Sequence, residues 1–272
     1  MTQTVLVTGA TDGLGKAVSV ELARAGAAVL VHGRSRERAD AALAEIRAAS
    51  GSKLLRACAG DFASLAQVRS LAESIERGEP RLDALVNNAG IGTEPGGGAR
   101  VESDDGYELR FAVNYLAPFL LTRLLEPLLV RSAPSRIVNV ASAGQAPLDF
   151  DDVMLERGYD SSRAYSQSKL AMVAWTFDTA ERLAGRGVTA TALHPGTYMP
   201  TKMVLAAGID PVDSLESGVR ATLRLIADPQ LEGVTGRYFD RLEEARARPQ
   251  AYDPDARVRL RELSERLVGM GA

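Results

Sequence analysis

The chain has 272 residues, 46% of them hydrophobic, which is enough material for one large core, so we expect a single domain of residues 1–272. Its net charge of -3 comes from 32 basic and 35 acidic residues, dispersed along the chain, which favours a small-molecule substrate over nucleic acid or a membrane as partner. The one cysteine, Cys58, cannot form an internal disulfide, and the N-terminus shows no signal-peptide pattern, so we expect a cytoplasmic protein.

Short β-rich runs alternate with longer helical patterns along the chain. Strands are predicted at residues 4–8, 28–32, 54–57, 82–87, 136–140 and 189–193, with a seventh near 237–239. Helices are predicted at residues 14–25, 36–49, 64–75, 106–130 and 164–183, with irregularity in 106–130 at its prolines, and a terminal surface helix is predicted at 255–268. Strands joined by helical crossovers make right-handed parallel βαβ units. The sequence therefore predicts an α/β fold: a doubly wound parallel sheet (Rossmann fold) of about seven strands, with helices on both faces and ligands beyond the strands' carboxyl ends.

The first predicted strand leads directly into a glycine-rich turn and a helix. Glycines permit a tight turn and close approach of backbone N–H groups to a phosphate, while the helix N-terminus supplies positive potential. An ordinary glycine-rich βα turn has the same composition, but this position at the start of a βαβ series favours dinucleotide binding. The expected cofactor contacts in this turn are Gly9, Thr11, Asp12, Gly13, Leu14 and Gly15.

Tyr165 and Lys169 are four residues apart on a predicted helix, so they project from one face. A phenol has a pKa of about 10, and a nearby ammonium group lowers that pKa. Such a tyrosine could give a proton to a carbonyl oxygen or take one from an alcohol. The pair also occurs by chance on solvated helix faces, so its meaning depends on the rest of the chain.

The spacing of the glycine turn resembles the T-G-x-x-x-G-x-G motif of short-chain dehydrogenases/reductases, and further marks of that family follow in order. They are Asn87-Asn88-Ala89-Gly90 after the fourth strand, Asn114, Ser142 after the fifth strand, Tyr165 with Lys169, and Pro195-Gly196 after the sixth strand. The resemblance covers roughly residues 4–240. Within the family, the sequence at 111–115 is most similar to soluble relatives of retinol dehydrogenases.

The resemblance implies a role for each member of a catalytic set. Tyr165 would be the general acid/base of hydride transfer between an alcohol and a ketone or aldehyde. Lys169 would lower the pKa of Tyr165 and bind the nicotinamide ribose, and Ser142 would hydrogen-bond the substrate oxygen. The main-chain carbonyl of Asn114 would hold a water that links Lys169 to solvent. Judged alone, Ser142 would be a turn or cap serine and Asn114 a satisfied buried amide.

The end of the second strand bears on which nicotinamide cofactor binds. An acidic residue there bonds the adenosine 2'-hydroxyl of NAD(H) and repels the 2'-phosphate of NADP(H). This chain has His32-Gly33-Arg34, with a glycine at the acidic position and a guanidinium beside it that could clamp a phosphate. We therefore predict NADP(H) in preference to NAD(H). Against this, Asp12 stands where many NADP-preferring relatives have a basic residue.

The resemblance also implies contacts for the rest of the cofactor. Asp61 and Phe62 would contact the adenine, although Asp61 could equally cap the next helix. The remaining expected contacts are Asn88, Ala89, Gly90, Tyr165, Lys169, Pro195 and Gly196. Neither of the two histidines has carboxylate or thiolate partners at metal-ligand spacing, so we expect no metal.

Two segments are expected to form the lips of the substrate pocket. Ser142 and Tyr165 are 23 positions apart, and the long segment between them predicts one lip. The second lip is predicted near 197–216, where Tyr198 and Met199 suggest an apolar substrate. The family's threonine four positions after the glycine is Pro200 here, and Thr201 comes one position later, so its usual amide contact is not assigned.

The helices at 106–130 and 164–183 are long and apolar on more than one face, which is typical of core or interface helices rather than of membrane spans. The family resemblance implies that they pack in a homodimer or homotetramer. Two other functions remain open: a non-catalytic dinucleotide-binding regulator and an NAD-dependent epimerase or dehydratase on the same fold. The presence of the whole Asn-Ser-Tyr-Lys set argues against the regulator, and the glycine spacing argues against the epimerase.

Overall fold

The computed structural model describes residues 2–94, 98–206 and 208–270, and its centre is one eight-stranded sheet of order β3-β2-β1-β4-β5-β6-β7-β8. The strands are β1 Thr4–Val7, β2 Ala28–Gly33, β3 Leu55–Ala59, β4 Ala84–Asn87, β5 Ser135–Val140, β6 Val188–His194, β7 Arg237–Asp240 and β8 Glu243–Ala245. Neighbours from β3 through β7 are parallel, and β8 pairs antiparallel with β7. The predicted doubly wound parallel sheet is therefore confirmed. The sequence had indicated about seven strands, and the eighth is short and polar, so no apolar run marks it.

The helices match most of the predicted ranges and add two that the sequence did not reveal. They are α1 Gly13–Arg24, α2 Arg36–Ser50, α3 Leu65–Gly78, α4 Leu109–Phe111, α5 Ala117–Arg131, α6 Ser161–Arg182, α7 Lys202–Ala206, α8 Leu215–Ala227 and α9 Pro254–Leu267. Short 3-10 helices lie at Pro229–Leu231 (η3) and Pro249–Tyr252 (η4). The range 106–130, predicted as a helix with irregularity at its prolines, consists of α4, a π-helix η2 at Ala112–Leu116, and α5, which has Pro118 in its first turn and Pro127 inside. The unpredicted helices α7 and α8 both belong to the region after β6.

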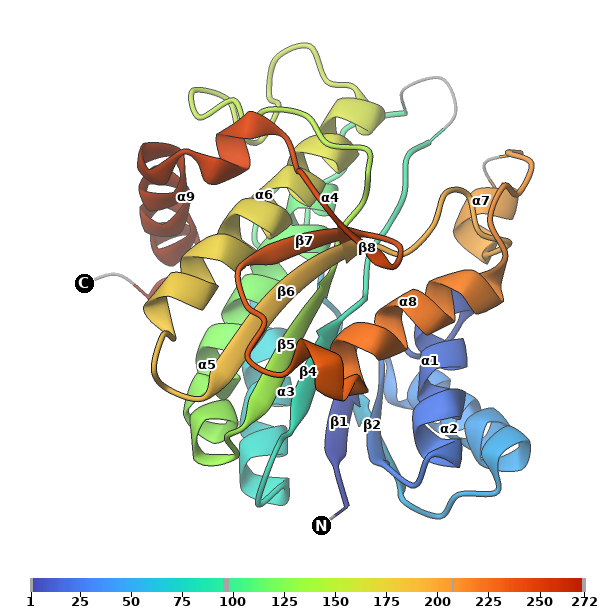
Figure 1. Cartoon of the computed structure of the whole chain (residues 1–272). Coiled ribbons are helices and arrows are strands. Elements are labelled where there is room, and N and C mark those ends of the chain that lie inside the picture. Colours follow the sequence, from blue (N-terminus) through green and yellow to red (C-terminus); the bar gives the residue numbers. More distant parts are fainter. Residues whose placement is uncertain (1, 95–97, 207, 271–272) are drawn as a thin grey trace.

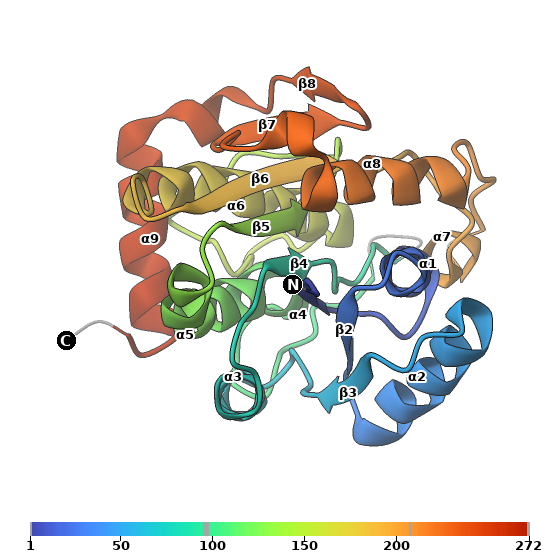
Figure 2. The same ribbon diagram turned by 60° about the horizontal axis from the view of Figure 1, so that its bottom comes forward.

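The sheet separates two hydrophobic cores, one under each helical layer. Helices α1, α2 and α8 cover one face, and α3, α5 and α6 cover the other (Figures 1 and 2). Successive strand residues alternate between the two cores, as in β1, where Val5 and Val7 face the first layer and Leu6 the second. Both faces are buried, which explains why the strands are continuous apolar runs. Cys58 lies in the second core, and burial raises the pKa of its thiol to about 12, as suits a small apolar role.

Helix α9 packs against α6 and lies alongside α5 (Figure 2). The hydroxyls of Tyr115 and Ser264 are 2.7 Å apart, and Arg123 Nη1 lies 2.8 Å from Glu265 Oε1. The stretch Leu109–Arg131 passes a length and hydropathy test for a membrane span, but 67% of that window is buried in the protein. These helices therefore have the packing of a protein core, and α9 contacts the two helices that were expected at a subunit interface.

The carboxyl ends of β1 and β4 lie side by side at the point where the strand order reverses, because the chain runs from β1 to β2 on one side and returns to β4 on the other. Open α/β sheets bind ligands at such a switch point. The glycine turn after β1 and the turn at Asn88 after β4 meet there.

Candidate active site

The glycine turn is locked against the turn that follows β4. Gly9 has φ +64°, and a Cβ added to it would lie 2.8 Å from the Ala89 Cα atom. A Cβ on Gly15 would lie 2.4 Å from both the Gly9 carbonyl oxygen and Asn88 Nδ2. The Asn88 amide group donates to the carbonyl oxygens of Thr8, at 2.8 Å, and Gly9, at 3.2 Å. Only glycine fits these positions, and the resulting bare backbone at the N-terminus of α1 suits a phosphate group.

Asp12 has a structural role in this turn. Its Oδ1 atom accepts from the Gly13 amide at 2.8 Å and so caps α1, and its Oδ2 atom lies 2.9 Å from Lys202 Nζ. Burial acts to raise the pKa of Asp12, but the bonds from Lys202 and Gly13 outweigh it and hold that pKa below its usual value. Thr201 lies here too, because a Cβ on Gly13 would be 3.0 Å from the Thr201 methyl group. The second lip therefore docks on the glycine turn.

The end of β2 has no room for an acidic side chain at the position where one would select NAD(H). A Cβ on Gly33 would lie 2.7 Å from the Thr11 methyl group and 3.0 Å from the Ala39 nitrogen. Arg34 is exposed, and among the described residues its guanidinium has no hydrogen-bond or ion-pair partner, whereas Arg36 pairs with Asp40 at 2.8 Å. Arg34 is thus available to an anionic ligand at this edge.

Asp61 and Phe62 follow β3 on the other side of β2. Asp61 Oδ1 accepts from the Ala63 amide at 2.9 Å and closes a local turn. The N-cap of α3 is Ser64, so the alternative in which Asp61 caps that helix is not what the structure shows. Phe62 is buried against the ring of His32, with centroids 4.8 Å apart. The sequence did not indicate this use of His32.

Ser142, Tyr165 and Lys169 come together beyond the carboxyl end of β5. The Ser142 hydroxyl oxygen accepts from the Gly144 amide at 3.0 Å. A Cβ on Gly144 would lie 3.5 Å from that oxygen and 3.9 Å from Tyr165 Cε1, so the serine and the tyrosine ring border the same space. Lys169 Nζ donates to the Val140 carbonyl at 2.9 Å and lies 5.7 Å from the centroid of the Tyr165 ring. Three of the four predicted catalytic side chains therefore face one another.

Burial controls the protonation of this group. It raises the pKa of the Tyr165 phenol above its usual value, and the Ser142 side chain opposes the rise only in part. It also lowers the pKa of Lys169 to about 8. The sequence had led us to expect that Lys169 would draw the Tyr165 pKa downward. In the protein alone the desolvation of the phenol prevails, so Tyr165 is a protonated group at neutral pH.

Asn114 lies in the π-helix η2, a type of distortion that is frequent at functional sites. Its side chain is fully bonded: Oδ1 accepts from the Ile91 amide at 2.8 Å, and Nδ2 donates to the Ile91 carbonyl at 3.1 Å and to Ser168 Oγ at 3.0 Å. The Ser168 hydroxyl in turn donates to the Tyr165 carbonyl at 2.7 Å. Gly90 is adjacent, since a Cβ there would lie 3.1 Å from Asn114 Oδ1 and 3.6 Å from Lys169 Nζ. Asn114 thus joins the turn after β4 to helix α6.

The second lip begins at Pro195-Gly196, which follow β6 and are buried. Asp213 holds its base: Oδ2 accepts from the Thr197 amide at 2.6 Å and from Arg241 Nη2 at 2.6 Å. Beyond this base the lip is open, with Tyr198 48% exposed, Leu205 57% and Val212 68%. Residue 207 of the predicted range 197–216 lies outside the described residues.

The first lip is anchored by a buried charge network that the sequence analysis missed. Arg110 and Glu108 are almost fully buried, with Arg110 Nη1 donating to the Tyr159 hydroxyl at 2.6 Å and that hydroxyl donating to Glu108 Oε1 at 3.1 Å. Arg110 Nε also donates to the Gly92 carbonyl at 2.8 Å. This network ties the segment before α6 to the chain that follows β4. The available sequence signal was weak: Glu108 and Arg110 alternate with Leu109 and Phe111 at the start of the predicted helix.

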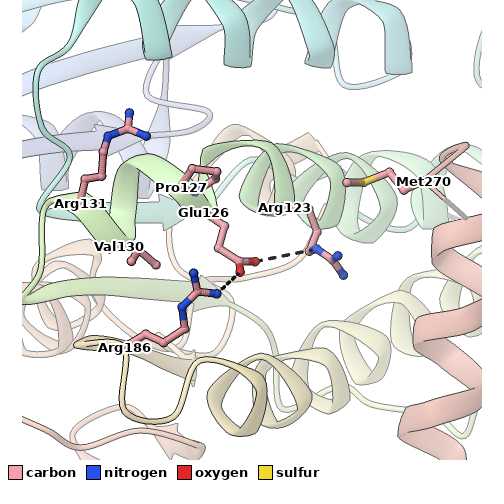
Figure 3. A pocket seen from close by; sticks show the side chains of 7 residues that line it. All are labelled: Arg123, Glu126, Pro127, Val130, Arg131, Arg186 and Met270. Atoms are coloured by element: carbon pink, nitrogen blue, oxygen red, sulfur yellow. Dashed lines mark hydrogen bonds and ion pairs between the residues drawn. The ribbon is translucent and has the colours of Figure 1, made fainter.

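Two hollows in the described surface differ in their relation to these residues. The one in Figure 3, about 370 Å³, lies at α5 and is lined by Arg123, Glu126, Pro127, Val130, Arg131, Arg186 and Met270. Its glutamate faces Arg186 at 3.1 Å, and none of the predicted site residues lines it. The other, about 530 Å³, lies where the second lip meets α1 and α2, and includes Asp12 and Gly13. Within the described residues, no cluster of three His, Cys, Asp or Glu side chains suits a metal.

Comparison with known proteins agrees with this geometry. The family model of short chain dehydrogenases matches residues 3–208. Together with the doubly wound sheet, this defines the class: the chain belongs to the short-chain dehydrogenase family and is an NAD(P)-dependent oxidoreductase acting on alcohol and carbonyl groups.

Within the family the chain is similar to retinol dehydrogenases. It is 38% identical to human retinol dehydrogenase 14, over 98% of this chain and 87% of that protein. It is also 38% identical to human retinol dehydrogenase 13, over 99% of this chain and 86% of that protein. A short chain dehydrogenase of Shigella flexneri complexed with NADP superposes with a TM-score of 0.72 at 26% identity, covering 89% of this chain and 97% of the other. The chain thus belongs to the retinol-dehydrogenase-like branch, as its sequence motifs indicated.

Proposed function

We propose that the protein is an NADP(H)-dependent oxidoreductase in which Tyr165 transfers the proton that accompanies hydride transfer. The observation that carries this proposal is the convergence of Ser142, Tyr165 and Lys169 beyond β5, beside a glycine turn whose geometry suits a dinucleotide. The bound nicotinamide would supply or accept the hydride. The protein's own groups orient the substrate and move the proton.

Each of these residues has a donor or acceptor that fits its proposed role. The Ser142 oxygen accepts from the Gly144 amide, and its O–H, which also interacts with Tyr165, is the proposed donor to the substrate oxygen. Lys169 uses one N–H on the Val140 carbonyl and keeps others for the ribose hydroxyls of a cofactor. Asn114 fixes the register between the turn after β4 and α6, and we propose that its main-chain carbonyl, within the π-helix, holds a water near Lys169.

The protonation state of Tyr165 favours the reductive direction. A proton donor must carry its proton at the working pH, and the raised pKa of Tyr165 keeps the phenol protonated. In the oxidative direction the phenolate is required, and the positive charge of an oxidised nicotinamide would favour its formation. We therefore propose carbonyl reduction as the direction for which the protein is preorganised.

The preference for NADP(H) is proposed from the end of β2. The close contacts at Gly33 oppose an acidic side chain, and the unpaired Arg34 guanidinium can bind a 2'-phosphate through charge-assisted hydrogen bonds. The other proposed cofactor contacts follow the order of the chain: the turn from Gly9 to Gly15, Asp61 and Phe62, the turn from Asn88 to Gly90, and Pro195-Gly196.

We propose an apolar alcohol or aldehyde as substrate. The names of its relatives specify retinol, and the open second lip carries exposed apolar side chains such as Leu205 and Val212.

Self-association and a cytoplasmic location remain proposals. Helix α9 packs against α6 and is linked to α5, so an interface formed by these two helices would have to include α9. Sedimentation at micromolar concentration tests the first, and fractionation of cells that express the protein tests the second.

The test is to mix the protein with NADPH or NADH and a panel of carbonyl compounds that includes retinaldehyde, and to follow the reduced-cofactor absorbance. We expect oxidation of NADPH with apolar aldehydes or ketones. Tight NADPH binding with no oxidation by any carbonyl would refute the reductase proposal and leave the regulator, and NAD retained through purification would support an epimerase or dehydratase.

A further inference from the structure

His32 stands at the centre of the adenosine side of the sheet. Strand β2 lies between β1 and β3, and its backbone bonds continue into the turns on both sides: the Ala10 amide donates to the His32 carbonyl at 2.9 Å, and the Gly60 amide to the Gly33 carbonyl at 3.1 Å. His32 is 2% exposed. Its side chain therefore lies between the glycine turn after β1 and the turn after β3.

Both ring nitrogens of His32 are bonded to these turns. The Gly9 amide donates to Nδ1 at 3.1 Å, and Nε2 lies 2.9 Å from the Gly60 carbonyl oxygen. A nitrogen that accepts from an amide carries no proton, so the hydrogen is on Nε2, which donates to Gly60. Burial lowers the pKa of the ring to about 4, with the Gly60 carbonyl and the nearby Asp61 carboxylate opposing the shift, so the ring is neutral at physiological pH.

The ring also supports the expected adenine contact. Its face packs against Phe62, the neighbour of Asp61, with centroids 4.8 Å apart. The buried His32 side chain thus contacts both the glycine turn and the Gly60–Phe62 segment, and a bound adenosine diphosphate would have to contact both of them together. Because Gly9 gives its N–H to His32, that amide is not free for a phosphate, which leaves the amides at the start of α1 for this purpose.

We propose that His32 is a positioning residue for the adenosine half of the cofactor: its neutral ring fixes the glycine turn against the Gly60 turn and so sets the separation that the nucleotide requires. The proposal rests on the proposed dinucleotide function. The His32 side chain makes no contact with the reacting atoms, so its replacement acts on nucleotide affinity rather than on the chemical step.

Three substitutions separate the contributions of the ring. His32→Asn keeps an acceptor near the position of Nδ1, His32→Gln keeps a donor near the position of Nε2, and His32→Phe keeps the ring on Phe62 with neither bond. Dissociation constants for ADP and NADPH are measured at neutral pH, together with kcat and the KM for the carbonyl substrate. ADP is included because it carries the adenosine diphosphate half alone.

We expect His32→Gln and His32→Phe, which leave the Gly9 amide unbonded, to raise both dissociation constants about tenfold. His32→Asn should stay within about threefold of the wild type, and kcat at saturating NADPH should be unchanged in all three. Equal nucleotide affinities in wild type, Gln and Phe variants would overturn this inference alone. A wild-type protein that binds neither ADP nor NADPH would overturn the proposed function as well.

A measurement on the wild-type protein covers the case in which the variants do not fold. The chain has two histidines, His32 and His194, and His194 lies at the other end of the site, next to Pro195. In ¹⁵N NMR of histidine-labelled protein, we expect the proton on Nε2 of His32 and a shift of its Nδ1 resonance on addition of ADP, with His194 unchanged. A His32 signal with the proton on Nδ1, or one that ADP does not move, would overturn the proposal.

Discussion

The turns around Gly9, Gly15 and Gly33, which are proposed to hold the adenosine half of the cofactor (the adenosine end), differ in construction from the two segments proposed as substrate lips. At the adenosine end, backbone atoms of three turns lie within contact distance of one another, and a Cβ on Gly9, Gly15 or Gly33 would collide with a neighbour. The second lip instead rests on a few polar contacts of side chains, such as Asp213 with Arg241 and Asp12 with Lys202, and leaves Leu205 and Val212 exposed. The backbone of the glycine turns is therefore held in one conformation by its close contacts. Side chains of the second lip can be substituted without disturbing the sheet.

In the proposed function, this difference would separate cofactor binding from substrate selection. Close backbone packing demands particular residue types at particular spacings, which a sequence records directly. Loops tolerate substitution, and their contacts decide which substrate fits. The first lip is intermediate, because the buried Arg110, Glu108 and Tyr159 network anchors a loop whose outer part is exposed.

The largest effect that sharpens the comparison is expected at Gly15. A Cβ in Gly15→Ala would lie 2.4 Å from the Gly9 carbonyl oxygen, so the glycine turn must shift. We expect the dissociation constant for NADPH to rise about a hundredfold, with a loss of about 1–3 kcal/mol in unfolding free energy. Titration of NADPH by fluorescence and urea unfolding measure the two.

Gly26→Ala is the matched control for Gly15→Ala. Gly26 has φ +86° but no atom within 4 Å of an added Cβ, so the substitution introduces backbone strain without a collision. It should cost about 1 kcal/mol of stability and leave NADPH affinity unchanged. Equal losses of affinity in the two variants would mean that the close packing of the glycine turn does not govern binding.

The next effect concerns cofactor choice. Arg34→Asp removes the guanidinium and adds a carboxylate at the end of β2, so the ratio of kcat/KM for NADPH to that for NADH should fall by a factor of about 10 to 100. Steady-state rates with both cofactors give this ratio. Arg77→Asp, the same charge change on α3, is the control and should leave the ratio as it is. An unchanged ratio in Arg34→Asp would refute the phosphate clamp.

The pH dependence of reduction tests the protonation states. Tyr165 acts as donor only while protonated, and its raised pKa preserves the phenol to higher pH. Lys169 loses its proton near its pKa of about 8. We expect kcat/KM for the carbonyl to fall severalfold as pH rises through that value and to be abolished only at the higher pKa of Tyr165. Complete loss below pH 8 would show that the phenol pKa is lowered in the working enzyme.

The smallest effect is expected in the second lip. Lys202 is 86% exposed and pairs with Asp12, which is 39% exposed, so the ion pair is screened by solvent. Lys202→Ala should change unfolding free energy by less than about 0.5 kcal/mol and the KM for NADPH by less than about threefold. A change above tenfold in that KM would show that this contact, rather than the backbone packing, holds the cofactor.

Much of this molecule follows from its sequence, and what does not has a physical reason. The strands, the glycine turn and the order of Asn114, Ser142, Tyr165 and Lys169 are local patterns with fixed spacing. The bonds of His32 and Arg110 join segments far apart in the chain, which no local pattern records. The short strand β8 is polar and has no apolar run to mark it, and the residues of Ala112–Leu116 continue the helical pattern of their neighbours, so the sequence does not distinguish the π-helix η2 from an ordinary helix.

The pKa of Tyr165 shows the same limit. Its spacing from Lys169 predicted a cation close to the phenol, and the structure has that lysine on the same side, 5.7 Å from the ring centroid. The direction of the shift depends instead on burial by surrounding elements, which the spacing does not contain. The sequence therefore predicted that Tyr165 and Lys169 are neighbours, whereas the packing around them decides the direction of the Tyr165 pKa shift.

The central claim, that Tyr165 is the proton donor of a nicotinamide-dependent reduction, is tested most directly by Tyr165→Phe with Tyr252→Phe as control. Tyr252 is 39% exposed, and its hydroxyl accepts from the Ala247 amide, outside the proposed site. With an active carbonyl substrate and saturating NADPH, we expect kcat of Tyr165→Phe to fall by a factor of about 10² to 10⁴ with NADPH affinity retained, and Tyr252→Phe to stay within about threefold of the wild type. A Tyr165→Phe enzyme that binds NADPH and reduces the carbonyl at the wild-type rate would contradict the account.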